Sequence, residues 1–253
     1  MHWILIRGLA RSAGHWGQFA THFERYCQGQ MTLIDLPGFG EFVDRPSPDS
    51  IEMITQHVIR QIRAKKSLRV RIGAVGISMG GMVASELAAR QREWVSHLVL
   101  INTSNRRYSK FYQRLLPAAY PTLVRALVTA KPAEKERIIF NLTCHRVEKS
   151  ASTLAEWQQI HQNYPCKKAA IVRQLQAAMK YQGLHKPPCK KILIVASERD
   201  RLVSPDCSKK LAAAWQTCCK IHPTAGHDLP HDDPLWLTNT IDQWLAADSI
   251  EKL

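Results

Sequence analysis

The chain has 253 residues, of which 45% are hydrophobic and 22% charged, a composition that indicates a globular domain and excludes a disordered or fibrous chain. No stretch approaches the roughly 18 consecutive apolar residues that a membrane span needs. The seven cysteines are odd in number and contain no CxxC pair, which predicts reduced thiols, a cytoplasmic protein and no zinc site.

The net charge of +14 is concentrated in one segment. Residues 105–191 contain 17 Lys and Arg against 4 Asp and Glu, a net charge of +13, which leaves +1 for the other 166 residues. No acidic residue lies between Glu93 and Glu134, so the first part of this segment has no internal partner for its cations. This asymmetry indicates either an acidic partner or an ordinary solvated basic face. Nucleic acid is disfavoured, because no recognised nucleic-acid motif accompanies the charge.

Short apolar, β-branched runs alternate with helical patterns along the chain. The first run has no basic leader and no small-residue cleavage site, which predicts a strand rather than a signal peptide. Strands are predicted at 3–6, 31–34, 69–75, 97–101, 192–196 and, more weakly, near 217–221. Helical periodicity is clear at 52–64, 82–92 and 234–246. The alternation predicts an α/β fold with a mostly parallel sheet of about six strands and helices on both faces.

The alternation is interrupted once, between the fourth and fifth predicted strands. The stretch from Asn102 to Lys191 has helical periodicity, several prolines and no convincing strand. Residues 105–191 are therefore predicted to form a helical, strongly basic lid, with 1–104 and 192–253 as the core. Since the insertion follows the end of a strand, it is expected over the carboxyl edge of the sheet, where open α/β sheets bind ligands.

The pentapeptide Gly76-Ile77-Ser78-Met79-Gly80 follows a predicted strand and precedes a predicted helix. This is the GxSxG nucleophile elbow, a sharp turn that exposes the serine hydroxyl above the sheet edge. Side chains at Gly76 and Gly80 would collide with the turn. Ser78 is therefore the predicted nucleophile.

A reactive serine needs a base and an acid that orients the base, and on this scaffold the chain order is Ser, Asp or Glu, then His. Asp200 follows the strand predicted at 192–196, and His227 lies in a loop between the last predicted strand and the last helix. They are predicted as the acid and the base. His231 is a rival base, but no small residue like Gly226 precedes it. The other nearby acids are interpreted as a surface residue (Glu198) and as charges at a helix N-terminus (Asp228, Asp232 and Asp233).

The tetrahedral intermediate of such a reaction needs an oxyanion hole of backbone N–H groups. On this scaffold one donor is the residue after the nucleophile, here Met79, and the other lies in the loop after the first strand of this chain. Gly8 permits a close backbone approach there, so Leu9 is the predicted second donor. The alternative for this loop is an ordinary strand-to-helix turn.

Together these residues resemble the α/β-hydrolase superfamily over essentially the whole chain. The matching features are the Gly8 loop with Trp16, the DLPGFG turn at 35–40, the elbow at 76–81, Asp200 and the Gly226-His227 pair. Within it the chain is most similar to the small carboxylesterases typified by the pimeloyl-ACP methyl ester esterase of biotin synthesis. That resemblance implies a serine esterase with no cofactor and a helical lid.

Two features depart from the family pattern. Arg7 precedes Gly8 where the family usually has His, which changes the charge near the site. The sequence also begins at what corresponds to the third strand of the family. Neither departure removes a predicted catalytic group.

The basic lid suggests how a substrate is delivered. If residues 105–116 form one helix, Arg106, Lys110 and Arg114 lie on one face, spaced to dock an acidic partner. An acyl carrier protein, small and strongly acidic, is such a partner. An anionic membrane surface is another, and it favours a lipolytic enzyme.

Three functions therefore stay open. The first is a carboxylic ester hydrolase acting on a methyl ester of a carrier-bound acyl chain, as in biotin synthesis. The second is a lipolytic, thioester, lactone or carbon–carbon bond hydrolase acting on a free small molecule or lipid. The third is a non-catalytic binding protein of the same fold, which a broken triad would indicate.

Overall fold

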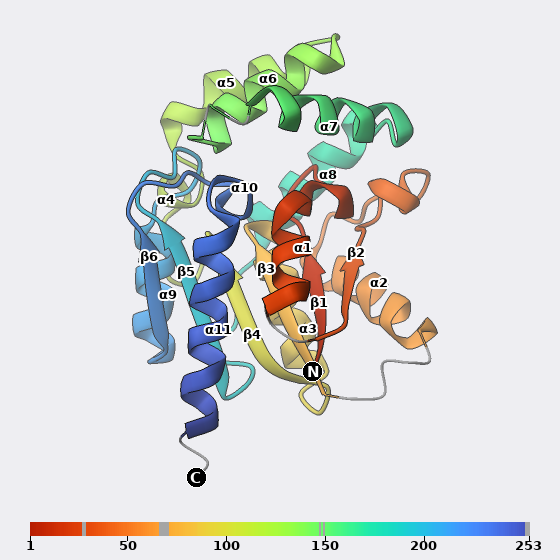
Figure 1. The fold of residues 1–253 in the computed structure, drawn as a ribbon. Coiled ribbons are helices and arrows are strands. Elements are labelled where there is room, and N and C mark those ends of the chain that lie inside the picture. The colour runs from red at the N-terminus through yellow and green to blue at the C-terminus, as the bar shows by residue number, and fades with distance from the viewer. Residues whose placement is uncertain (27–28, 66–70, 147, 149, 251–253) are drawn as a thin grey trace.

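Six parallel strands form a single sheet in the order β2-β1-β3-β4-β5-β6 (Figure 1). The computed structural model describes residues 1–26, 29–65, 71–146, 148 and 150–250, so Cys27 and the first residues of the strand predicted at 69–75 lie outside the described part. The strands are β1 His2–Ile6, β2 Met31–Ile34, β3 Ile72–Ile77, β4 Val95–Ile101, β5 Lys191–Ser197 and β6 Cys218–His222. The predicted α/β fold with a mostly parallel sheet is confirmed.

Helices cover both faces of this sheet, which explains why its central strands are apolar without alternation. Along β1, Ile4 and Ile6 pack into one hydrophobic cluster, whereas Trp3 and Leu5 pack into the other. The first cluster is completed by α2 Ile51–Ala64, α3 Met79–Arg90 and α9 Asp206–Trp215. The second is completed by α1 Gly17–Tyr26 and α11 Pro234–Ile250, which contact each other.

Because all strands are parallel, their carboxyl ends meet at one edge of the sheet. Arg7 follows β1, Ser78 follows β3 and Asn102 follows β4 directly. Asp200 lies three residues beyond β5, and His227 lies between β6 and α10 Leu229–Asp232. Five loops from distant parts of the sequence are therefore brought to the same edge, as expected for a ligand site in this architecture.

Helices fill the long segment between β4 and β5, which contains no strand among its described residues. They are α4 Phe111–Arg114, α5 Tyr120–Val128, α6 Pro132–Thr143, α7 Ser150–Asn163 and α8 Lys168–Lys180. Figure 1 shows α5, α6 and α7 above the carboxyl ends of the strands. We call α5, α6, α7 and α8 the lid helices. The exact division into a core and a lid at 105–191 stays a prediction.

The condition for the docking stripe, a single helix over 105–116, is not met. Only Phe111–Arg114 is helical there, and the backbone N–H of Arg106 donates to the carbonyl of Tyr181 instead of to a helical turn. The guanidinium of Arg114 is turned to the end of α8, where it donates to the carbonyls of Met179 (3.1 Å) and Ala178. Burial lowers the pKa of Arg114. A one-sided stripe of three cations therefore does not form.

Candidate active site

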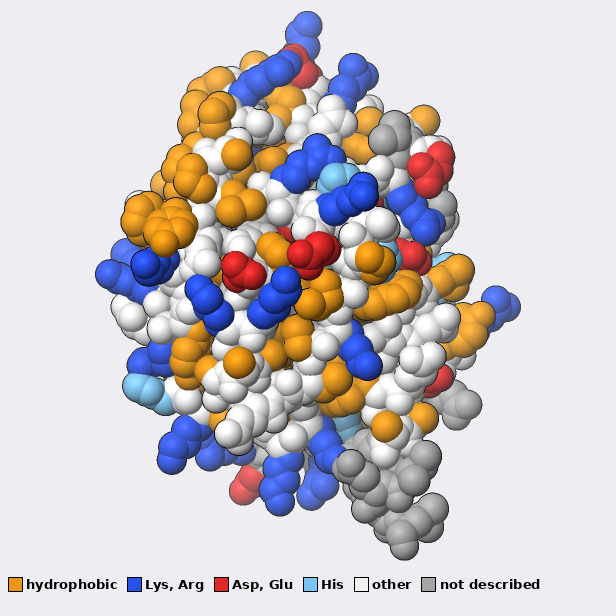
Figure 2. All heavy atoms as spheres, turned by 90° about the vertical axis from the view of Figure 1, so that its left-hand side faces the viewer, with side chains coloured by type: hydrophobic (Ala, Val, Ile, Leu, Met, Phe, Trp, Pro, Cys, Tyr) orange, Lys and Arg blue, Asp and Glu red, His pale blue; other side chains and the backbone are white. Residues whose placement is uncertain are grey.

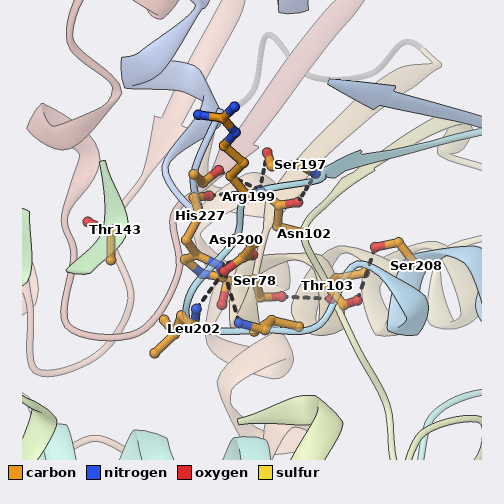
Figure 3. Close-up of polar contacts among 12 residues, drawn as sticks. Ser78, Asn102, Thr103, Thr143, Ser197, Arg199, Asp200, Leu202, Ser208 and His227 are labelled. Carbon is orange, nitrogen blue, oxygen red and sulfur yellow. Dashed lines mark hydrogen bonds and ion pairs between the residues drawn. The ribbon is translucent and has the colours of Figure 1, made fainter. Parts of the chain in front are cut away.

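Ser78 occupies a strained turn between β3 and α3. Its φ of 56° is in the left-handed region, which is unusual for a residue with a side chain. Its backbone N–H donates to the Ile101 carbonyl (2.8 Å), and its own carbonyl accepts from the Thr103 hydroxyl (2.8 Å; Figure 3). The strand after the elbow thus helps to hold the elbow in its strained conformation.

The two outer glycines of the elbow are required by close backbone contacts. A Cβ at Gly76 would lie 2.4 Å from the Gly80 carbonyl oxygen, and one at Gly80 would lie 2.2 Å from the carbonyl oxygen of Ile6. Both distances are far shorter than a van der Waals contact. The collisions expected from the sequence pattern are therefore present, and the local geometry is that of the predicted nucleophile elbow.

His227 and Asp200 are hydrogen-bonded to each other beside the elbow. The distance from His227 Nδ1 to Asp200 Oδ2 is 2.6 Å, and both residues are buried. The second carboxylate oxygen, Oδ1, accepts from the backbone N–H groups of Leu202 (2.7 Å) and Val203 (2.9 Å), which fixes the carboxylate (Figure 3). This arrangement leaves Nε2 of His227 as the ring nitrogen that can exchange a proton with a substrate or a serine.

The rival residues have other partners. The ring of His231 lies edge-on to Phe140, with the ring centroids 5.5 Å apart. Glu198 is half-exposed and pairs with Lys209 at the surface, as expected. Asp233 accepts from the Trp236 backbone N–H at the start of α11, which agrees with the expected helix N-terminal role.

Asp228 stands at the N-cap position of α10, but its side chain does not cap that helix and forms a buried ion pair with Arg7 instead of serving as the charge expected near Pro234. Two parallel hydrogen bonds of 3.0 and 2.6 Å join the guanidinium to the carboxylate. Burial alone would raise the pKa of Asp228, but the Arg7 guanidinium beside it lowers that pKa to about 2. The pair ties the loop after β1 to the residue next to His227. This pairing gives the Arg7 that replaces the usual family histidine a structural role.

The loop after β1 approaches Ser78 closely. A Cβ at Gly8 would lie 3.1 Å from Ser78 Cβ and 3.2 Å from the carbonyl oxygen of Ile77. Leu9 follows at the wall of the same cavity that Ser78 lines. Met79 is the first residue of α3, where a backbone N–H has no acceptor within its own helix. Leu9 and Met79 are thus placed on the two segments expected to form an oxyanion hole.

The end of the Gly8 loop is attached to the lid helices. Arg11 Nη1 donates to Glu136 Oε2 of α6 at 2.6 Å, and its guanidinium lies 4.0 Å from the ring centroid of Trp157 in α7. The backbone N–H of Ala10 donates to the side-chain oxygen of Gln174 in α8 (3.0 Å). Three lid helices therefore hold the loop that carries Leu9.

Asn102 and Thr103 were not among the residues predicted from the sequence. The Asn102 side chain accepts from Ser197 N (2.8 Å) and donates to the backbone carbonyl of His227 (2.8 Å), so it joins the ends of β4 and β5 to the histidine loop. Asn102 is buried and has a φ of 45°. The position of Asn102 in the sequence could have indicated this role, because a buried asparagine directly after an apolar strand needs hydrogen-bond partners at the sheet edge.

One cavity joins these groups. It has a volume of about 150 Å³, and Ser78, His227 and Leu9 line it. Its apolar wall comes mainly from the lid helices: Leu123, Ala126 and Leu127 of α5, Ile139 and Leu142 of α6, and Ile171 of α8. An acyl chain bound there would be largely removed from water.

One group in the described residues has three side chains with metal-ligand atoms within 4.8 Å of one another: Cys144, His231 and Asp232. Burial raises the pKa of the Cys144 thiol well above its usual value, which disfavours the thiolate that a metal would need. The carboxylate of Asp232 already accepts from the backbone N–H groups of His145 and Gly226. These features indicate a structural cluster that joins α6 to the histidine loop.

Residues 3–239 match the alpha/beta hydrolase family, and the chain belongs to that family. A thermophilic esterase from Thermogutta terrifontis is structurally similar, with a TM-score of 0.74, 20% identity and coverage of 98% of this chain and 90% of that one. The enol-lactonase from Burkholderia xenovorans LB400 has a TM-score of 0.76 and 19% identity, and the match covers 97% and 91% of the two chains. At these identities the likeness concerns the fold.

Sequence relatives lead toward one group within the family. The chain is 30% identical over 104 residues to the pimeloyl-[acyl-carrier protein] methyl ester esterase of Pseudoalteromonas atlantica, which is 41% of this chain and 37% of that protein. It is 36% identical over 75 residues to the biotin biosynthesis bifunctional protein BioHC of Teredinibacter turnerae, covering 30% of this chain and 12% of that protein. The chain thus matches little more than a third of the first relative and about an eighth of the second.

Proposed function

We propose that the protein is a carboxylic ester hydrolase that forms an acyl-enzyme on Ser78. The observation that carries this proposal is the 2.6 Å hydrogen bond between His227 Nδ1 and Asp200 Oδ2, next to a strained serine elbow. His227 and Ser78 line the same cavity. An oriented imidazole beside a serine hydroxyl is the arrangement that activates that hydroxyl group.

In the proposed mechanism, Ser78 Oγ attacks the ester carbonyl carbon while Nε2 of His227 takes the hydroxyl proton. The negative charge on the carbonyl oxygen is stabilised by the N–H groups of Leu9 and Met79. As the carbon–oxygen bond breaks, His227 returns the proton to the leaving alcohol. Water then attacks the acyl-enzyme by the same route and releases the acid. Asp200 stabilises the imidazolium throughout and keeps its own charge.

The test compares Ser78→Ala with the wild-type protein on a short p-nitrophenyl ester. We expect the variant to keep its thermal stability and to lose at least about a thousandfold in kcat. Ser85→Ala is a matched control, because Ser85 lies on the same α3 helix and its hydroxyl donates to the carbonyl of Gly81. A fluorophosphonate should add to the wild type and to Ser85→Ala, but not to Ser78→Ala, as measured by mass spectrometry. An unchanged rate in Ser78→Ala would refute the proposal.

For the substrate, we propose an acyl ester delivered by an acidic carrier protein. The support comes from the charge of +13 in residues 105–191, the apolar cavity under the lid helices, and the partial similarity to a pimeloyl-[acyl-carrier protein] methyl ester esterase. A methyl ester of a dicarboxylic acid would be offered free and loaded on acyl carrier protein. We expect a higher kcat/KM for the loaded ester at low salt, and a loss of that advantage as salt screens the charges.

Arg106 and Lys110 remain the proposed docking residues, and Arg114 is a weaker candidate because its guanidinium binds the end of α8. Arg106→Glu and Lys110→Glu should lower kcat/KM for the loaded ester more than for the free one. Activity that is indifferent to both the carrier and salt would refute docking without affecting the esterase proposal.

A second candidate function is supported by the exposed apolar side chains of α5. Tyr120, Val124 and Val128 recur every fourth residue and are 39%, 60% and 65% exposed. Figure 2 shows hydrophobic side chains gathered at the upper part of one face, with Lys and Arg nearby. Apolar and basic side chains together can bind an anionic membrane surface, where the active site would meet a lipid ester. Vesicles containing phosphatidylglycerol should then raise the rate on a lipid ester above that with phosphatidylcholine alone. No helix among the described residues is long and apolar enough to cross a membrane.

A further inference from the structure

The charges that line the active-site cavity do not cancel. Three cations, Arg7, Arg11 and Lys135, and two acids, Glu136 and Asp228, contribute to its wall. Both acids already have a cationic partner, since Asp228 forms two hydrogen bonds to Arg7 and Glu136 binds Arg11 at 2.6 Å. Within the described residues, the ammonium group of Lys135 has neither a hydrogen bond nor an ion pair. The cavity therefore carries one uncompensated positive charge.

Lys135 is part of a wall that is otherwise apolar. It is half-buried on α6, and Ile139 and Leu142, four and seven residues later, line the same cavity, so one face of the helix borders it. A ligand that fills the cavity would displace water from this wall, and the attraction between the Lys135 ammonium and a negative charge on the ligand would then be stronger than in water.

Unpaired N–H groups add to the positive character of this region. Arg11 Nη2 and Arg7 Nε are buried, and neither has a hydrogen-bond partner in the described part of the structure. Arg11 is bound to Glu136, the residue directly after Lys135, so the guanidinium and the ammonium belong to neighbouring parts of the wall. The buried guanidinium adds positive potential there, and the ammonium of Lys135 can donate to an anionic oxygen.

We propose that the cavity selects esters whose acyl chain carries an anionic oxygen group, and that Lys135 binds this group. The proposal rests on the proposed ester hydrolase function and names its substrate class. The ester carbonyl would lie at Ser78, the chain along the apolar wall, and the anionic group at Lys135. Two sources fit this chemistry: the terminal carboxylate of a free half-ester, and the phosphate of a carrier-protein arm.

The experiment compares three methyl esters of equal chain length, over a series of lengths: one with a terminal carboxylate, one with a terminal methyl and one with a terminal amine. For the wild type we expect kcat/KM to be about ten- to a hundredfold higher for the carboxylate than for the methyl ester, since a charged hydrogen bond is gained. The amine should be the poorest substrate. One chain length should be optimal, because Ser78 and Lys135 both belong to the wall of one cavity and the chain must reach from one to the other.

Lys135→Met should remove most of the preference for the carboxylate, and Lys135→Glu should reverse it in favour of the amine. Arg137→Met is the matched control, because it removes one positive charge from the same helix at an exposed position outside the cavity wall. That control should keep the wild-type ratio. Equal losses on all three esters in Lys135→Met, or the same change of ratio in Arg137→Met, would overturn the proposal.

Two further measurements separate the remaining outcomes. Methyl esters joined through a thioester to pantetheine, with and without its terminal phosphate, test the second source. A Lys135→Met effect confined to the phosphorylated arm identifies phosphate, whereas no effect on any anionic ester refutes the inference.

Calorimetric binding of the half-ester and the neutral ester to the Ser78→Ala protein keeps the test independent of catalysis. If the wild type hydrolyses none of the esters but binds the half-ester more tightly, the proposed function fails and the anion subsite stands.

Discussion

Asp228→Asn tests how the buried Arg7–Asp228 pair supports the site. The substitution keeps the shape of the side chain but removes the negative charge that faces the guanidinium. Both side chains are nearly inaccessible, with exposed fractions of 3% and 4%. Arg7 would therefore remain charged in a buried site without its counter-ion. The loop that carries Leu9 and the residue next to His227 would both lose their common anchor.

Two arguments give the magnitude of the effect on stability. Removing one partner of a buried ion pair typically costs about 3–5 kcal/mol, because the other charge is left uncompensated. Independently, the pKa of Asp228 falls from 3.8 to about 2, which corresponds to about 2 kcal/mol of net stabilisation. The second value is smaller since it already includes the cost of burying the carboxylate. We expect a loss of about 3 kcal/mol in the free energy of unfolding.

The pH dependence of this contribution has a definite sign. A carboxylate with a lowered pKa in the folded state stabilises the protein above its unfolded pKa, and this stabilisation is lost as the pH falls through the folded value. The contribution of Asp228 should thus be complete above about pH 4 and disappear toward pH 2. The difference in stability between the wild type and Asp228→Asn should shrink over the same interval.

Urea unfolding and thermal melts at pH 7 measure the stability effect. About 3 kcal/mol corresponds to a fall in Tm of roughly 6–12 °C for a chain of this size. The rate on a short ester should also fall by about tenfold or more, since both catalytic loops lose an anchor. Glu198→Gln is the control, because it breaks a half-exposed ion pair at 3.4 Å and should cost less than about 1 kcal/mol.

The double variant Arg7→Met/Asp228→Asn completes the test. If the damage in Asp228→Asn comes from the unpaired guanidinium, the double variant should be more stable than the sum of the two single effects predicts. Additive effects, or a loss below about 1 kcal/mol in Asp228→Asn, would refute the reasoning.

Two further substitutions probe the reacting groups. Asp200→Asn should preserve the fold but lower kcat by up to about ten thousandfold, because the amide favours the wrong tautomer of His227. The measurement is kcat as a function of pH. A maximum kcat equal to that of the wild type would contradict this prediction. Gly8→Ala places a methyl group 3.1 Å from Ser78 Cβ, so the loop must shift and the rate should fall about ten- to a hundredfold with little change in Tm. Normal kinetics in Gly8→Ala would show that Leu9 is not an oxyanion donor.

Local patterns were enough to predict the sheet. Each strand is a short apolar run, and the six predicted runs correspond to six observed strands within a few residues. The elbow was predictable for a related reason, since Gly76 and Gly80 make contacts within a few residues of Ser78 or with the neighbouring strand. The order of Ser78, Asp200 and His227 along the chain then followed from the order of the strands.

The docking stripe considered for 105–116 required a single helix, and helical spacing of charges does not by itself make one. The backbone of this stretch is held by hydrogen bonds to residues about 75 positions away, such as that from Arg106 to Tyr181. The guanidinium of Arg114 likewise donates to a backbone carbonyl of α8, that of Met179. Such long-range contacts leave no periodic signal in the local sequence.

By itself, the sequence determined the α/β architecture, the strained serine turn and the order of the three predicted catalytic residues, because all depend on hydrophobic periodicity and turn chemistry. Only the tertiary structure decided the pairing of charges. Asp228 lies beside His227 in sequence, yet its partner is Arg7, 221 residues away. Glu136 binds Arg11 across 125 residues. These pairs leave Lys135 as the uncompensated charge of the cavity in the described structure, and electrostatic balance at a site depends on distances in space that a linear sequence does not contain.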